Sequence, residues 1–317
     1  GRHVLWANSR YRGADYALIM EKVACDLGEA ICDAKERLGY SNIVLAGWSG
    51  GGSLMMWYQA LAEAGAGISD TAAGDPYTVA ASRLPAASSI MMLAAHVSRH
   101  RIFTEWLDPS ISDESQPNLR DAKLNLYDTS NPNQPPYSAD FLEHFAQAQV
   151  ARNRRITASV KEKLAVIRAS GSPWSEFAFT VHGTMADPRW LDPSIEPSDR
   201  KAGSCYLGDP QIVNDGPVGL ARFCTLRSWL SQWSYDDARC DAIVSGSRIS
   251  VPVLVIGNSA DDACTPSHTQ RLYDAVTHEQ KHLHVVKGAT HYYTGANGAE
   301  HMAEACAVIE KFLAYRR

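Results

Sequence analysis

The sequence lacks a long hydrophobic run, an excess of basic residues and a paired-cysteine motif. No apolar stretch approaches the ~18 residues that cross a bilayer, so no membrane-spanning segment is expected in it. The formal net charge of -5 argues against a surface that binds nucleic acid or anionic lipid. The seven cysteines are scattered without a CxxC pair, which predicts reduced thiols in a cytoplasm rather than a disulfide framework or a zinc site.

An initiating methionine and a signal-peptide pattern are also absent, since the chain opens with "GRHVLWANS". We find no internal repeat and no low-complexity tract. What is present is the composition of a globular protein, with 45% hydrophobic and 21% charged residues.

Short apolar runs alternate with segments of helical periodicity. Strands are predicted in residues 3–8, 41–49, 87–98, 250–258 and 281–290, and helices in residues 22–38, 53–67 and 300–317. Such alternation predicts an α/β fold with a mostly parallel sheet flanked by helices.

The segment 99–249 differs from the rest of the chain. It is rich in Pro, Asp and Ser, contains few strand-like runs and holds five of the eight tryptophans. A plain connection would be much shorter. We therefore predict a mainly helical cap inserted between two parts of a core, with residues 1–98 as the first part and 250–317 as the second.

The stretch Gly47-Trp48-Ser49-Gly50-Gly51 fits the pattern G-x-S-x-G between a predicted strand and a predicted helix. A strand that reverses into a helix within one or two residues strains the serine, and glycines on both sides relieve steric clashes. The pattern therefore predicts a nucleophile. The alternative is a glycine-rich turn that binds a phosphate or no ligand.

A nucleophilic serine needs a base, and the base needs an orienting acid. Asp261 and Asp262 follow the fourth predicted strand, and His291 follows the fifth. The order serine, acid, histidine suits a triad assembled at the carboxyl ends of parallel strands. Position alone leaves either aspartate as the acid.

These motifs resemble the α/β-hydrolase superfamily over roughly residues 3–98 and 250–317. "GYSNIVLAGWSGG" is similar to the family's helix, strand and elbow, and "RYRGAD" to its Arg-Gly loop. Asp262 to Pro266 reproduces the family's D-x-x-x-P acid loop, so the resemblance favours Asp262 over Asp261, which would then cap the next helix or loop. "GATHYYTG" nominates His291.

The resemblance is incomplete before the elbow. Members usually carry a second oxyanion donor on a loop after an earlier strand, often marked by His-Gly, and no His-Gly precedes Ser49. We therefore expect that N-terminal strands are missing through truncation or processing. Gly50 N–H remains as one donor, and losing the other would cost on the order of 10²–10³ in rate. Alternatively, "NSRYRG" supplies it.

Four further residues are candidates for the substrate pocket: Trp48 because it adjoins Ser49, and His96, Tyr292 and Arg10 by their loop positions. Alternatively, Trp48 packs under the helix. The tryptophans of segment 99–249 would line an apolar pocket above Ser49 or form the core of the cap itself.

Together these features predict a serine hydrolase that cleaves a carboxylic ester or lactone of a small to medium, largely apolar compound through an acyl-enzyme. Hydrolysis of a carbon–carbon bond in a diketone and acyl transfer need the same triad, and a catalytically silent binding protein is the alternative from another class. The reaction requires no metal or organic cofactor. The expected partner is a small-molecule substrate, without nucleic acid or membrane, and homo-oligomerisation is left open.

Overall fold

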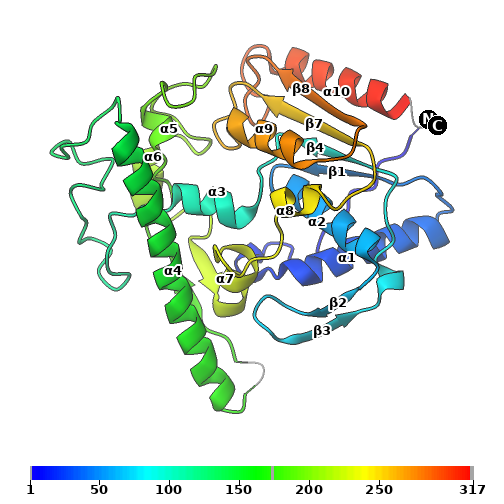
Figure 1. Cartoon of the computed structure of the whole chain (residues 1–317), viewed down its shortest axis with the longest axis horizontal. Coiled ribbons are helices and arrows are strands. Elements are labelled where there is room, and N and C mark those ends of the chain that lie inside the picture. Colours follow the sequence, from blue (N-terminus) through cyan, green and yellow to red (C-terminus); the bar gives the residue numbers. More distant parts are fainter. Residues whose placement is uncertain (1, 173–174, 315–317) are drawn as a thin grey trace.

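A four-stranded parallel sheet forms the centre of the protein, whose computed structural model describes residues 2–172 and 175–314. The strands lie in the order β1-β4-β7-β8 (Figure 1). Their bounds are Val44–Trp48 for β1, Ser89–Leu93 for β4, Val253–Asn258 for β7 and Lys281–Val286 for β8. All three pairings are parallel, which confirms the predicted α/β fold class.

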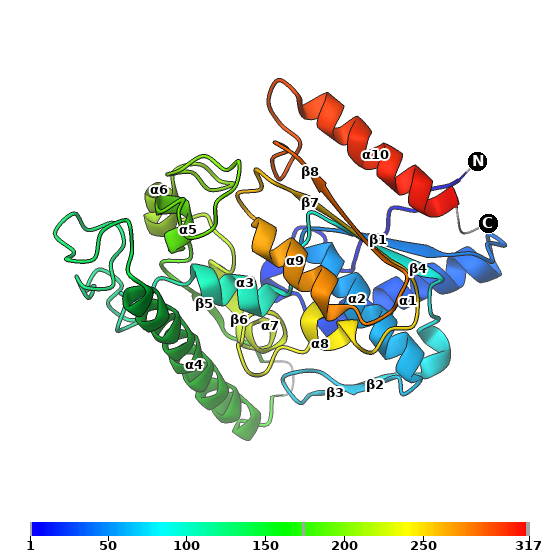
Figure 2. The same cartoon turned by 45° about the horizontal axis from the view of Figure 1, so that its top comes forward.

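Helices cover both faces of this sheet. Figure 2 shows α10 on one side of the strands and α2 and α9 on the other. The flanking helices are α1 (Met20–Glu36), α2 (Gly50–Ala64), α8 (Ala242–Gly246), α9 (Pro266–Ala275) and α10 (Gly298–Ala314). The predicted helices at 22–38, 53–67 and 300–317 correspond to α1, α2 and α10.

Successive strand residues point to opposite faces, so the apolar runs supply two cores. Met91 and Leu254 pack with Phe312 of α10 on one face. Met92 and Val255 pack in the cluster on the other face, which includes residues of α2 and α9. Every residue of β7 is buried, as a continuous apolar run in a parallel sheet requires.

The strand predicted at residues 3–8 is wrong. These residues form no strand, and the side chains of Val4 and Trp6 are 92% and 83% exposed. An apolar run becomes a strand only where a neighbouring strand pairs with it, and none does so here. A hairpin between β2 (Ile68–Asp70) and β3 (Pro76–Val79), which the sequence did not reveal, follows α2.

The segment 99–249 lies largely to one side of the sheet, with the 31-residue helix α4 running along it (Figures 1 and 2). Its elements before α8 are α3 (Arg99–Trp106), α4 (Ala139–Ala169), β5 (Ala178–Thr180), α5 (Pro188–Leu191), α6 (Pro210–Asp215), β6 (Phe223–Thr225) and α7 (Leu226–Gln232). Two single-turn helices, η1 (Asp15–Ala17) and η2 (Ala81–Arg83), complete the described secondary structure.

The tryptophans of this segment pack in two clusters. Trp229 and Trp233 lie mainly among residues of the segment itself, whereas Trp106 and Trp190 also pack with Ala263 and Cys264 of the second part of the chain. Four of the five are buried: Trp106, Trp190, Trp229 and Trp233. Trp174, the fifth, lies outside the described residues. The end of the segment packs with the helices that flank the sheet, because Ala242 of α8 lies in one cluster with Met56 of α2 and Leu272 of α9. The division of the chain at residues 98/99 and 249/250 therefore stays a prediction.

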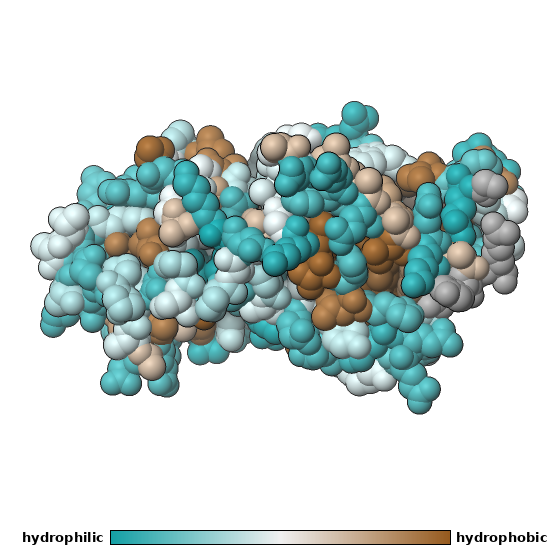
Figure 3. Space-filling view, turned by 90° about the horizontal axis from the view of Figure 1, so that it is seen from above, coloured by the Kyte–Doolittle hydropathy of each residue, from teal (hydrophilic) through white to brown (hydrophobic). Residues whose placement is uncertain are grey.

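Seen from above, hydrophilic residues cover most of the surface, and hydrophobic residues gather near its middle (Figure 3). Among the described residues, no helix has the length and apolar character needed to cross a membrane. All seven cysteines are free thiols.

Candidate active site

Ser49 occupies the turn between β1 and α2 in a strained backbone conformation. Its φ of 53° and ψ of -119° lie where non-glycine residues are rare. The turn holds because Ser49 N–H donates to the Leu93 carbonyl at 3.0 Å. The predicted sharp strand-to-helix turn is therefore present.

Two glycines allow the close approach of strand and helix at this turn. A Cβ on Gly47 would lie 2.3 Å from the Gly51 carbonyl oxygen, and one on Gly52 would lie 2.3 Å from Ala95 Cβ. A Cβ on Gly51 would meet nothing within 4 Å. The glycine that packs on the helix side is therefore Gly52, not Gly51 as the motif suggested.

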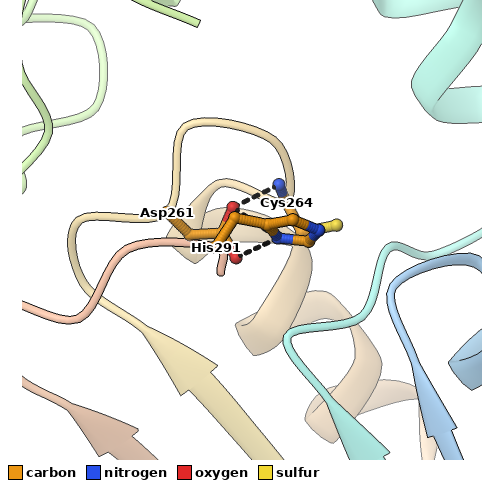
Figure 4. A group of neighbouring side chains, drawn as sticks. All are labelled: Asp261, Cys264 and His291. Atoms are coloured by element: carbon orange, nitrogen blue, oxygen red, sulfur yellow. Dashed lines mark hydrogen bonds and ion pairs between the residues drawn. The ribbon is translucent and has the colours of Figure 1, made fainter. Parts of the chain in front are cut away.

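His291 and Asp261 form a buried pair at the same edge of the sheet. Asp261 follows β7 and His291 follows β8, and His291 Nδ1 lies 2.8 Å from Asp261 Oδ2 and 3.0 Å from Oδ1. Asp261 Oδ1 also accepts the N–H groups of Ala263 and Cys264, at 2.9 and 2.7 Å. These contacts fix the carboxylate against the imidazole (Figure 4).

The choice of Asp262 as the partner of His291 is wrong. The D-x-x-x-P spacing points to Asp262, but the loop turns so that the preceding carboxylate faces the imidazole. Burial and the negative charge of Asp261 raise the pKa of Asp262. Its main-chain carbonyl accepts Trp190 Nε1–H at 3.1 Å, which ties this residue to segment 99–249 instead.

Cys264 connects the serine to the acid–base pair. Ser49 Oγ lies 3.9 Å from Cys264 Sγ. That sulfur, a ring nitrogen of His291 and a carboxylate oxygen of Asp261 lie within 4.8 Å of one another. Figure 4 shows Asp261 at one edge of the imidazole and the sulfur at the opposite edge. The serine hydroxyl points to the thiol here rather than bonding the imidazole, and catalytic hydrogen bonds often tighten only once substrate binds.

Within the part of the chain that the structure describes, the same three side chains could hold a metal ion. However, Asp261 already accepts hydrogen bonds from two amides and from the imidazole, which suits a carboxylate that orients a base. Burial also raises the pKa of the Cys264 thiol well above its usual value, so the sulfur carries its proton at neutral pH.

Aromatic rings surround the imidazole. Trp48, directly before the serine, lies 4.7 Å from the ring of His291 and 5.2 Å from that of Tyr292. Trp48 and Tyr292 are 43% and 49% exposed, whereas His291 is buried. Both predicted pocket aromatics therefore lie at the mouth of the site.

Gly50 opens helix α2, where amide groups have no partner within the helix and the dipole favours negative charge. Its N–H is therefore suited to bind an oxyanion. In the stretch "NSRYRG" the amides of Arg10 and Tyr11 are already used by Asp26 and Ser9. The Arg10 side chain also binds Asp26, with a shortest distance of 2.6 Å, so this pocket candidate has a partner on α1.

His96 and Arg99 lie beside Gly50. The position of a Cβ on Gly50 would be 3.2 Å from His96 Nε2 and 3.5 Å from Arg99 Nη2. Burial and the charge of Arg99 hold the pKa of His96 well below its usual 6.5, so the imidazole is neutral at pH 7. His96 was a predicted pocket residue. Arg99 was not, because no sequence pattern separates it from Arg101, which binds Asp241 at 2.6 Å.

Comparisons with known proteins add a fold-level likeness. No family model and no curated protein matches the chain. Among solved structures, the chain is similar to a monoacylglycerol lipase of Paleococcus ferrophilus (16% identity, TM-score 0.40, covering 92% of this chain and 76% of the lipase). It is also similar to the α/β hydrolase GrgF of Penicillium sp. sh18 (11%, 0.44, 95% and 72%). A third is Est816, described as an N-acyl homoserine lactone degrading enzyme (14%, 0.37, 94% and 76%).

In this chain the serine follows β1, the aspartate follows β7 and the histidine follows β8, which is the order of nucleophile, acid and base that α/β-hydrolase triads have.

Proposed function

We propose that this chain is a serine hydrolase that cleaves a carboxylic ester or lactone through an acyl-enzyme. The observation that supports it most is the buried Asp261–His291 pair beside a serine held at a positive φ. A serine in an ordinary glycine-rich turn would need neither the strain nor the neighbouring pair.

In this proposal Ser49 attacks the substrate carbonyl while His291 accepts its proton. Asp261 keeps the proton of the imidazole on Nδ1, leaves Nε2 free as the base and stabilises the imidazolium that forms. Gly50 N–H binds the oxyanion of the tetrahedral intermediate. His291 then protonates the leaving group. In the second half of the reaction water attacks the acyl-enzyme while His291 accepts its proton, and His291 then returns a proton to Ser49 as the acyl group leaves.

The serine must first turn away from Cys264. Rotation of the Ser49 side chain would turn its hydroxyl from the Cys264 sulfur, now at 3.9 Å, toward the imidazole of His291. A change between staggered rotamers is a small rearrangement. The exposed rings of Trp48 and Tyr292 would contact an apolar part of the substrate. Segment 99–249 would act as a cap over this edge of the sheet.

The test is turnover of 4-nitrophenyl esters and simple lactones. Ser49→Ala and His291→Ala should each lose at least about 10³ of kcat, since a serine without its base is a poor nucleophile. Ser53→Ala is the matched control: it removes a buried hydroxyl one turn further along α2 and should keep its activity. Equal activity of Ser49→Ala and wild type would refute the proposal.

We also propose a cytoplasmic location and a small-molecule substrate as the partner, supported by seven unpaired thiols and the acidic net charge.

A further inference from the structure

Arg99 is a half-buried residue whose guanidinium no carboxylate of the described residues neutralises. Its Nη1 donates to Gln232 Oε1 at 2.9 Å, and its planar group lies 5.6 Å from the centre of the Trp233 ring. Within the described residues no acidic group is at ion-pair distance; Asp15 acts on it only from further away. A buried charge normally has a paired partner, so the missing partner calls for an explanation.

The unpaired edge of this guanidinium faces Gly50, the residue after the proposed nucleophile. Nη2 and Nε lie 3.5 and 3.6 Å from the position that a Cβ on Gly50 would occupy. Nε is buried without a hydrogen-bond partner. This edge of Arg99 therefore lies directly beside Gly50, whose amide would bind the oxyanion.

His96 reaches Gly50 from the loop after β4. Its Nε2 lies 3.2 Å from the same hypothetical Cβ, whereas the ring nitrogen that is buried without a hydrogen-bond partner is Nδ1. The unpartnered atom beside Gly50 is therefore Arg99 Nε, with His96 Nε2 next to it. An oxygen atom of a bound ligand would give Arg99 Nε an acceptor.

We propose that Arg99 and His96 form a carboxylate-binding subsite, so that the substrate is an ester or lactone that also bears a carboxylate on its acyl part. The inference rests on the proposed function, since it assigns a substrate class to the same site. An arginine recognises a carboxylate through charge-assisted hydrogen bonds that are about twice as strong as neutral ones.

The spacing limits how far the carboxylate lies from the reacting carbonyl. The N and Cβ positions of one residue are joined by two bonds of about 1.5 Å each, which places Arg99 Nη2 within about 6.5 Å of Gly50 N. The carbonyl oxygen and the carboxylate of one short acyl chain would fit across this distance. Half-esters of small dicarboxylic acids have that form.

Burial lowers the pKa of Arg99, which means that its surroundings disfavour the cation when no anion is bound. A substrate carboxylate would remove this penalty, so binding and the charge of Arg99 support each other.

The experiment compares mono-(4-nitrophenyl) glutarate with its neutral methyl ester. Wild type should have the higher kcat/KM for the acid. Arg99→Gln should lower kcat/KM roughly ten- to one-hundred-fold for the acid and little for the methyl ester. Arg99→Lys should recover part of this loss because it keeps the charge. Arg101→Gln, on the same helix, is the control and should change kcat/KM equally for both substrates, if at all.

Calorimetric binding of glutarate to Ser49→Ala provides a readout without turnover. It should show binding that Arg99→Gln removes, and thermal unfolding of each variant confirms that it is folded. If Ser49→Ala keeps its turnover, the proposed function fails. If Arg99→Gln lowered kcat/KM equally for the two esters, or if glutarate binding did not depend on Arg99, the subsite alone would be overturned.

Discussion

At the scale of single residues, the site depends on which carboxylate faces His291. Asp261 is buried and accepts two main-chain amides besides the imidazole, whereas Asp262 is tied through its carbonyl to Trp190. A sequence can place two adjacent aspartates in the right loop, but it cannot tell which one turns inward. One residue of offset in an irregular loop changes the direction of the side chain.

Asp261→Asn is therefore expected to lower kcat by about 10⁴, because an asparagine holds the imidazole in the wrong tautomer. Asp262→Asn should leave kcat nearly unchanged. Steady-state kinetics on one chromogenic ester measures both. A larger loss in Asp262→Asn would restore the assignment that the sequence motif suggested.

Cys264 should resist alkylation although it lies at the site. Burial raises the pKa of its thiol well above the usual value, and the thiolate is the reactive form. Iodoacetamide at pH 8 should modify Cys306, which is exposed on α10, before Cys264. Peptide masses after timed quenching give the order. Equal rates in the folded protein would show that the thiol is accessible.

At the scale of elements, the turn between β1 and α2 depends on glycine at positions where a side chain would clash with the neighbouring main chain. Gly47→Ala should cost about 3 kcal/mol or more, because the new Cβ would meet the Gly51 main chain at 2.3 Å. Gly51→Ala is the matched control. It meets nothing within 4 Å and should be neutral or stabilising by about 0.5–1 kcal/mol, since alanine favours the helix.

Chemical denaturation of both variants tests this difference. If Gly47→Ala were as stable as Gly51→Ala, strand and helix would not approach as closely as the structure has them.

The periodic elements were predictable because local patterns determine them. The apolar runs at β4 and β7 and the helical spacing of α1 predict the correct type of element. The run at residues 3–8 has a similar pattern but lies exposed without a partner strand, so the same local signal gave the wrong answer. The pairing of a strand is a property of its neighbours. Arg99 escaped prediction for the same reason, since only the fold shows that none of the described acidic side chains pairs with it.

At the scale of the whole molecule, one polar network joins segment 99–249 to the second part of the chain. Glu105 on α3 binds Arg189 of α5 at 2.7 Å and both His268 and Arg271 of α9 at 3.0 Å. Burial alone would raise the pKa of Glu105, but the interactions with His268, Arg189 and Arg271 outweigh it and hold the pKa well below 4.5.

A carboxylate whose pKa is depressed on folding stabilises the protein above its unfolded pKa, and this contribution disappears as the pH falls through the folded pKa. Glu105→Gln should therefore lower the free energy of unfolding by ~1.5–3 kcal/mol at pH 7. The difference from wild type should persist down to about pH 4.5 and shrink below it. Urea denaturation across this range measures it.

Glu162→Gln, an exposed substitution on α4, is the control and should change stability little at any pH. A difference for Glu105→Gln that grows as the pH falls would mean that the network does not favour the ionised carboxylate.

The most direct test of the central claim is the site at which a fluorophosphonate probe reacts. The Asp261–His291 pair should activate one hydroxyl, so peptide mass spectrometry should find a single adduct on Ser49 that disappears in Ser49→Ala and forms far more slowly in Asp261→Asn. An unlabelled Ser49 in folded wild-type protein, or labelling that does not depend on Asp261, would contradict the account.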